Sequence, residues 1–199
     1  MDNPPLVQIL LGLLIGIGLS AATGLRVFVP LLGVSIAAYA GHLSLANGFQ
    51  WLGTWPALTA FAAATVVEVA AYYIPWLDYA LDAAAAPAAV LAGTVLTVSL
   101  LGEASPFMRW TLGIIAGGGV AGVVQAGSML ARGASTATTG GLGNPLVATV
   151  EFAGSVLLTL LAILLPVLCA ALALALVFFA ISRFARRPRR HSAASTGVA

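Results

Sequence analysis

Long apolar stretches, separated by short polar or glycine- and proline-rich breaks, set the pattern of this chain. The apolar runs cover residues 6–23, 27–42, 57–74, 84–101, 111–131 and 145–182. Most of them approach the roughly 20 residues that an α-helix needs to cross a bilayer, while the short second run is expected to tilt or to lie partly at the interface. Barrel strands would instead alternate apolar and polar residues in short segments. The pattern predicts an all-α protein, a polytopic transmembrane helix bundle with six or seven hydrophobic segments.

The last run, residues 145–182, is too long for one span. A helix of that length would measure about 57 Å, nearly twice the hydrocarbon thickness of about 30 Å. Pro166 is its one obvious break, so either two spans meet there or the first part is partly re-entrant. Seven spans place Arg26 and Arg132 on the same side as the C-terminal arginines, which the positive-inside rule favours. Because no polar turn lies near Pro166, a topology with six spans stays an alternative.

The composition decides the class of protein. Of 199 residues, 61% are hydrophobic and 7% are charged, whereas a soluble domain has about 25% charged residues. We therefore expect an integral membrane protein that is surrounded by the lipid bilayer. Five of its eight basic residues, all of them arginines, lie in Arg183–Arg190. This cluster suits the anionic cytoplasmic face of a membrane better than nucleic acid. We expect a multi-pass protein of the bacterial cytoplasmic (inner) membrane with a cytoplasmic C-terminus.

We expect one membrane-embedded helical domain over residues 1–182 and a basic, disordered tail over residues 183–199. Two pairs of short segments resemble each other in order along the chain: 11–18 with 112–119, and 64–68 with 148–151. Their order would fit an internal repeat of residues 6–82 and 107–182, as in many transporter folds. Glycine- and alanine-rich membrane helices also resemble one another by composition alone, so both explanations stay open.

A glycine-rich segment at residues 133–145 interrupts the apolar sequence. It carries hydroxyls at Thr138 and Thr139, then three glycines, then Asn144 followed by a proline. Glycine and Asn-Pro do not continue a helix comfortably, whereas an asparagine can cap a new helix that has proline in its first turn. We expect residues 135–143 to be non-helical and to lie at membrane depth or at a cavity mouth.

Two carboxylates, Glu68 and Glu151, lie inside apolar runs. A charge at mid-membrane costs roughly 3 kcal/mol or more, so such residues usually face a cavity or a charged partner. Arg26 and Arg132, which lie beside helix breaks, are candidate partners. The carboxylates could couple transport to protons, or they could only hold helices together. The polar residues that we predict to form a solute or ion pathway are Glu151, Glu68, Thr138, Thr139, Asn144, Arg26 and Arg132.

The sequence offers no support for catalysis or for a bound cofactor. The P-loop, HExxH, GxSxG and CxxC signatures do not occur. The single cysteine, Cys169, cannot form a cysteine metal cluster. Asp78 and Asp82 lie one helical turn apart, but no further ligand is identifiable near them, so we expect no metal site. A membrane enzyme that works through its acidic side chains stays open.

The leading hypothesis is a transporter or channel-like permease for a small solute or ion, with proton coupling through Glu68 or Glu151. The alternatives are a non-catalytic membrane scaffold or assembly factor and, third, a lipid-modifying enzyme. A homo-oligomer is compatible with each of them, and no nucleic-acid partner is expected. The glycines in Gly117–Gly122 predict close helix packing.

Three patches of the chain resemble one known family. They are Gly18–Arg26 with Pro30, then Glu68 followed by Pro75 and Asp78, and finally Thr138–Pro145 followed by Glu151. The chain resembles an uncharacterised family of small bacterial multi-pass inner-membrane proteins, classed as a domain of unknown function. The likeness covers nearly the whole chain except the tail. It implies a multi-pass membrane protein and supplies no activity.

The arginine cluster generates a prediction about topology. A reporter fused after Ala199 should be active in its cytoplasmic form, because five arginines directly after an apolar run resist translocation. Paired fusions to a cytoplasm-dependent and a periplasm-dependent reporter measure this. Activity of the periplasm-dependent reporter alone would contradict the predicted orientation.

Overall fold

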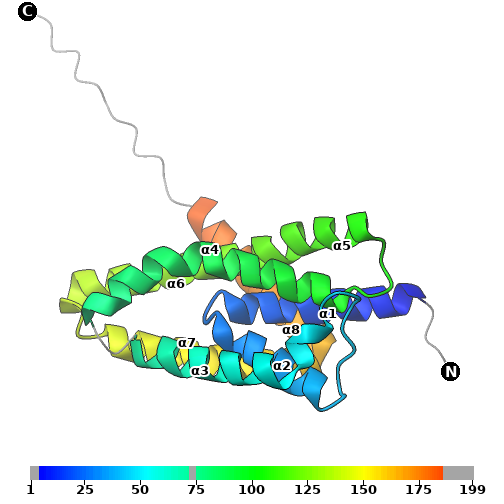
Figure 1. The fold of residues 1–199 in the computed structure, drawn as a ribbon. Coiled ribbons are helices and arrows are strands. Elements are labelled where there is room, and N and C mark those ends of the chain that lie inside the picture. The colour runs from blue at the N-terminus through cyan, green and yellow to red at the C-terminus, as the bar shows by residue number, and fades with distance from the viewer. Residues whose placement is uncertain (1–4, 72–74, 186–199) are drawn as a thin grey trace, which may run out of the picture.

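The computed structural model describes residues 5–71 and 75–185, and its regular elements in these ranges are all helical (Figure 1). The helices are α1 (Pro5–Thr23), α2 (Phe28–Tyr39), η1 (Gln50–Gly53), α3 (Trp55–Ala71), α4 (Pro75–Leu100), α5 (Pro106–Leu112), η2 (Gly113–Gly118), α6 (Gly119–Thr139), α7 (Asn144–Leu164) and α8 (Pro166–Ala185). The all-α prediction is confirmed. From residue 186 on, the expected tail lies outside the described residues, as do the side chains of Asp78 and Asp82.

Three of the helices that the structure describes are long and apolar enough to cross a membrane. They are Pro5–Thr23, Pro106–Thr139 and Asn144–Leu164. The second of these joins α5, η2 and α6 into one rod of 34 residues. Shorter apolar helices form the rest of the bundle. The expectation of an integral membrane protein with apolar helices therefore agrees with the structure.

The glycine-rich segment breaks the chain in a different place from the prediction. We expected residues 135–143 to be non-helical, but α6 continues to Thr139, and only residues 140–143 form a turn. The hydroxyls of Thr138 and Thr139 donate hydrogen bonds to carbonyls four residues back in α6, at 2.9 and 2.7 Å. The first glycine after them, Gly140, takes a left-handed conformation (φ 63°) and ends the helix. The segment is thus a tight turn between two helices, largely exposed at one end of the bundle.

Pro166 divides the long apolar run into α7 and α8, as one of the two alternatives predicted. Leu165 has a non-helical conformation (φ −136°, ψ 63°) between the two helices. The Cys169 thiol donates a hydrogen bond to the carbonyl of Leu158 at 3.4 Å. Such a contact between residues eleven apart requires the chain to reverse. With α5, η2 and α6 counted as one rod, the described residues therefore contain seven apolar helical segments.

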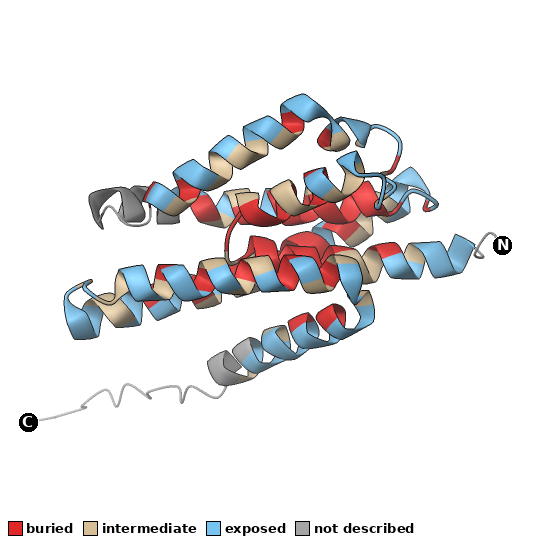
Figure 2. Cartoon of the chain, turned by 90° about the horizontal axis from the view of Figure 1, so that it is seen from below, coloured by how far each residue is buried: buried red, intermediate tan, exposed pale blue. Residues whose placement is uncertain are grey.

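Helices α1 and α2 form a hairpin whose tip, residues 24–27, is buried inside the bundle. Helix α2 has 12 residues, so its length is about 18 Å, which is less than the hydrocarbon thickness of about 30 Å. Gly24 at the tip lies against Ala121 and Val124, midway along the rod Pro106–Thr139. Figure 2 shows that buried residues are concentrated in this central part of the bundle. We expected buried irregular backbone at residues 135–143, and the structure has it at residues 24–27 instead.

Glycines bring α1 and η2 close to α4. A Cβ atom on Gly12 would lie 2.3 Å from the backbone oxygen of Leu100, and one on Gly117 would lie 2.5 Å from the backbone oxygen of Gly93. Ser20 of α1 donates a hydrogen bond to the carbonyl of Gly93 at 3.1 Å. Small residues thus allow backbones to touch where three helices meet, as predicted for Gly117–Gly122.

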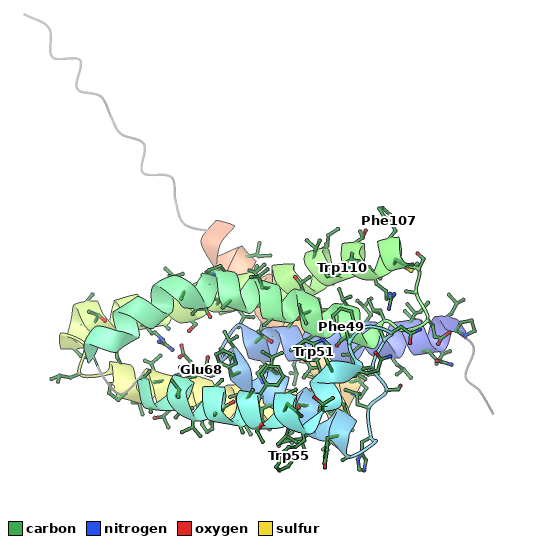
Figure 3. All side chains as sticks on the ribbon, in the orientation of Figure 1. Phe49, Trp51, Trp55, Glu68, Phe107 and Trp110 are labelled. Atoms are coloured by element: carbon green, nitrogen blue, oxygen red, sulfur yellow. The ribbon has the colours of Figure 1, made fainter. Side chains whose placement is uncertain are left out.

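Aromatic side chains gather toward the end of the bundle that holds the N-terminus of α1 (Figure 3). Trp51 and Trp55 are 52% and 61% exposed, and the rings of Tyr39 and Trp55 lie 6.1 Å apart. Exposed tryptophans are typical of the membrane–water interface. Between α2 and α3 the chain forms a surface loop that contains η1, and α3 begins at Trp55.

The two pairs of similar segments differ in their orientation. The segments 11–18 and 112–119 both run antiparallel to α4. The other pair, which contains Glu68 and Glu151, lies on α3 and α7. Helix α3 runs antiparallel to α2, since it contacts the end of α2 through Trp55 and the start of α2 through Glu68. Helix α7 runs parallel to α2. The two segments of the first pair therefore run in the same direction, whereas α3 and α7 run in opposite directions. A duplicated set of helices would give both pairs the same relation.

The packing at Gly117 generates a prediction about stability. Gly117→Ala should lower the free energy of unfolding by about 1–3 kcal/mol, because the new methyl group would press against the backbone of α4. Gly119→Ala is the matched control, since its Cβ would meet nothing within 4 Å. Unfolding of both variants in detergent measures the difference. Equal midpoints for the two variants would contradict close packing at Gly117.

Candidate functional site

Arg26 lies at the tip of the α1–α2 hairpin and is 2% exposed. The segment breaks after Thr23 because Gly24 packs directly against α6, and α2 starts at Phe28. One terminal nitrogen of Arg26 donates a hydrogen bond to the carbonyl of Ala148 in α7, at 2.9 Å. The same nitrogen lies 3.4 Å from a carboxylate oxygen of Glu151. The hairpin tip is therefore bound to α7 through its charged side chain.

Glu151 of α7 also binds two side chains of α6. Its carboxylate forms an ion pair with the guanidinium group of Arg132, whose Nε donates to Oε1 at 3.2 Å. The hydroxyl of Ser128 donates to the same Oε1 atom. Ser128 and Arg132 are one helical turn apart, so both face α7. Glu151 thus joins the α1–α2 hairpin, α6 and α7, and we call Arg26, Ser128, Arg132 and Glu151 the central cluster.

Glu68 of α3, labelled in Figure 3, also contacts the hairpin tip. Its Oε1 atom accepts a hydrogen bond from the backbone nitrogen of Val27 at 2.8 Å, and its Oε2 atom accepts one from Phe28 at 3.1 Å. These N–H groups belong to the start of α2, where the helix dipole favours a negative charge. Val27 itself supplies no side-chain cap. Glu68 therefore caps α2 from a different helix.

The buried charges of the described residues balance. They are the carboxylates of Glu68 and Glu151 and the guanidinium groups of Arg26 and Arg132. Two positive and two negative formal charges cancel, which reduces the cost of holding them in an apolar interior. Removing one partner of such a set usually costs about 3–5 kcal/mol, because it leaves an uncompensated charge.

The predicted pathway residues therefore fall into three places. Arg26, Arg132 and Glu151 come together in the central cluster, and Glu68 binds the start of α2 from α3. Thr138, Thr139 and Asn144 lie at the α6–α7 turn instead. The hydroxyl of Thr139 accepts a hydrogen bond from the backbone nitrogen of Gly143 at 2.9 Å, and the Asn144 amide donates to Thr136 at 3.1 Å. These contacts hold the turn, and Asn144 is roughly 10 Å along α7 from Glu151.

Sequence reasoning did not find Ser128, because a single serine in an apolar helix is common. A signal was present in the spacing. Gln125, Ser128 and Arg132 are all buried, and they fall on one face of α6 at helical intervals. A buried polar stripe of this kind on a membrane helix indicates a polar contact with a neighbouring helix.

Two apolar grooves reach the two buried carboxylates. The first has a volume of about 550 Å³ and lies between α6, α7, α8 and the hairpin tip, with Ser128 and Glu151 as its only polar lining residues. The second has a volume of about 480 Å³ and lies between α2, α3 and α4, with alanines around Glu68. Volumes of this order are typical of small-molecule sites.

A family model described as "Domain of unknown function (DUF4126)" matches residues 13–186. The chain belongs to this family. The match contains α2 to α8 entirely, and with them both buried carboxylates and both buried arginines, so the resemblance noted in the sequence is confirmed. The DUF4126 description carries no activity. Neither a curated protein nor a solved structure matches the chain.

The central cluster generates a prediction about coupling between its charges. Glu151→Gln should destabilise the protein by about 3–5 kcal/mol, because Arg26 and Arg132 would share no counter-ion. Arg132→Gln should also be destabilising. The double variant should cost less than the sum, since the remaining Arg26 and Glu68 charges still cancel. Unfolding of all four proteins in one detergent measures the coupling, expected at about 0.5–3 kcal/mol. Strictly additive costs would contradict a direct interaction.

Proposed function

We propose that this protein is a transporter or permease for a small solute, with the central cluster as the element that changes between its states. The observation that carries the proposal is the cluster itself, a buried set of charges inside a membrane protein, one of which, Arg26, lies on irregular backbone. Charged groups in membrane interiors are expensive and usually mark substrate, ion or proton pathways. Irregular backbone is tolerated at that depth only when it is buried in protein or lines a cavity.

The hairpin geometry supports this proposal. Many transporters place their sites at discontinuous helices, with a half-helix start directed at the site. Here α2 is a half-length helix that starts at Phe28, two residues after Arg26, and the N–H groups of Val27 and Phe28 donate hydrogen bonds to Glu68. The hairpin is bound to α7 by Arg26 and to α3 by Glu68. Weakening either contact would free the hairpin tip to move.

Glu151 supplies a route to proton coupling. As a carboxylate it is the shared counter-ion of Arg26 and Arg132. Protonation of Glu151 would remove its negative charge and leave the two buried guanidinium groups without their shared counter-ion. The protein would then favour either a conformation that separates α7 from α6 or the binding of a compensating charge. Protonation of Glu151 and movement of the cluster are therefore linked in this proposal.

The lining of the first groove favours a second candidate, a membrane scaffold. The groove at Glu151 is apolar apart from Ser128 and Glu151. Such a lining offers few hydrogen bonds to water, so this conformation does not provide a hydrated pathway along the groove. A scaffold would keep its ion pairs permanently closed, whereas a transporter would open them during its cycle. Flux across a membrane distinguishes the two functions.

The proposed function predicts solute-dependent proton flux in reconstituted vesicles. With a pH gradient imposed, a panel of organic acids, amines, amino acids and sugars is added while a trapped dye reports internal pH. At least one solute class should change the rate of proton entry. Glu151→Gln should reduce that change more than tenfold, because glutamine cannot exchange a proton.

Glu103→Gln is the control, since Glu103 is exposed in the loop after α4. It should leave the flux unchanged. Variants are compared per folded, inserted molecule, so a loss of stability is not counted as a loss of function. Absence of solute-dependent flux for the whole panel with correctly inserted protein would favour the scaffold.

A further inference from the structure

We propose that the second groove, between α2, α3 and α4, binds a primary ammonium ion with a short apolar body, and that Glu68 holds the ammonium. Three features of the described residues support the proposal. Glu68 has unused acceptor capacity, it has no cationic partner, and it is the one polar group in an apolar lining. The site is separate from the first groove, and the proposal does not depend on the proposed transport.

Both carboxylate oxygens of Glu68 act as acceptors in the structure. Oε1 accepts a hydrogen bond from the backbone nitrogen of Val27 at 2.8 Å, and Oε2 accepts one from that of Phe28 at 3.1 Å. Two N–H donors at the start of a helix favour the charged carboxylate over the neutral acid. An ionised carboxylate has about four lone-pair sites, and the backbone bonds occupy only one on each oxygen. Glu68 can therefore accept further hydrogen bonds from a ligand.

The buried charges of the described residues are unevenly placed, although their formal sum is zero. Arg26 and Arg132 both lie at ion-pair distance from Glu151. Within the described part of the chain, Glu68 has no cationic side chain at that distance. Its compensation comes from amide N–H groups at a helix start, which carry only partial charges. The carboxylate that lines the second groove is thus the locally negative end of the set, and the groove favours a cation.

The lining of the second groove selects an organic cation over a metal ion. Apart from Glu68 it consists of five alanines, two valines and a phenylalanine. Calcium takes about six to eight oxygen ligands and magnesium about six, but the two oxygens of one carboxylate are all that these side chains supply. An ammonium ion can donate charge-assisted hydrogen bonds to that carboxylate while its hydrocarbon body contacts the alanines and valines. A volume of about 480 Å³ accommodates a short body of this kind.

The small side chains of the groove offer a way to fill it without changing Glu68. Ala63 lines the groove and is exposed, so a larger side chain there replaces no core contact. Ala60 lies on the same helix, is also exposed, and is not part of the lining. Ala63→Leu should therefore narrow the groove, and Ala60→Leu is its matched control.

The test measures binding to the full chain in a neutral detergent, by calorimetry and by the shift of the unfolding midpoint. The probes are hexylammonium, hexyltrimethylammonium, hexanol and hexanoate, which share one body and differ in their heads. Hexylammonium should bind most tightly, because it alone combines a positive charge with N–H donors. Hexyltrimethylammonium should bind about tenfold more weakly or worse, since it cannot donate to the carboxylate. Hexanoate should not bind. Butylammonium should lose roughly fourfold in affinity for each CH₂ group removed.

The variants separate the ammonium site from partitioning into the micelle. Glu68→Gln should weaken hexylammonium binding by about tenfold or more, because glutamine keeps the shape of the side chain and loses its charge. Ala63→Leu should weaken it by a similar factor, whereas Ala60→Leu should leave it unchanged. The two leucine variants keep the test decisive if Glu68→Gln does not fold.

Three results would overturn the proposal. They are equal binding of the four hexyl probes, unchanged hexylammonium binding in Ala63→Leu, and a midpoint shift by calcium chloride alone that Glu68→Gln abolishes. The last result would assign the site to a metal ion.

Phosphatidylethanolamine and phosphatidylcholine, added to the same micelles, identify the source of the ammonium. Competition by phosphatidylethanolamine alone assigns the site to a lipid head, because only that head carries a primary ammonium. Absence of competition assigns it to a free amine, and the site is retained in both cases. The transport proposal is judged separately by flux, so hexylammonium binding without flux would retain this site and reject transport, and flux without hexylammonium binding would do the reverse.

Discussion

The structure depends on one carboxylate that two arginines share. Glu151 contacts Arg26 from the α1–α2 hairpin and Arg132 from α6, and these three elements meet around it. In water an ion pair contributes little, because each charge is already well solvated. Inside a membrane protein the unpaired alternative is far worse, so the requirement that the arginines be neutralised decides which helices must be adjacent.

Placing an arginine at the hairpin tip requires the hairpin to enter the bundle, and small residues allow this. Gly12 and Gly16 of α1 contact the backbone and the Thr97 side chain of α4, and Gly24 contacts α6. Larger side chains at these positions would meet atoms of the neighbouring helix and push the helices apart. Glycine packing and ion pairing are therefore parts of one arrangement, in which close backbones bring the charges within reach.

The half-length of α2 creates a second requirement, which Glu68 meets. A helix that starts inside the bundle exposes N–H groups that water or headgroups would normally satisfy. Glu68 accepts hydrogen bonds from two of them and supplies the negative charge that the helix start favours. The two glutamates thus have different environments. Glu68 accepts hydrogen bonds from backbone N–H groups, whereas Glu151 binds the side chains of Arg26, Ser128 and Arg132.

The sequence by itself determined the class of protein and its helical segments, offered a break at Pro166 as one of two alternatives, and singled out four charged residues that are buried in the structure. These follow from local composition and helix propensity, which act over a few residues along the chain. It did not determine which break is buried. The glycines near 140 and the glycine at 24 look alike as local signals, yet the first form an exposed turn and the second the tip of a buried hairpin. Only the tertiary structure decided this, because the contacts that bury Arg26 join residues more than one hundred positions apart, such as Arg26 and Ala148. Contacts between residues so far apart depend on how whole helices pack. The sequence of a helix that is apolar on every side does not indicate which neighbouring helix each side contacts.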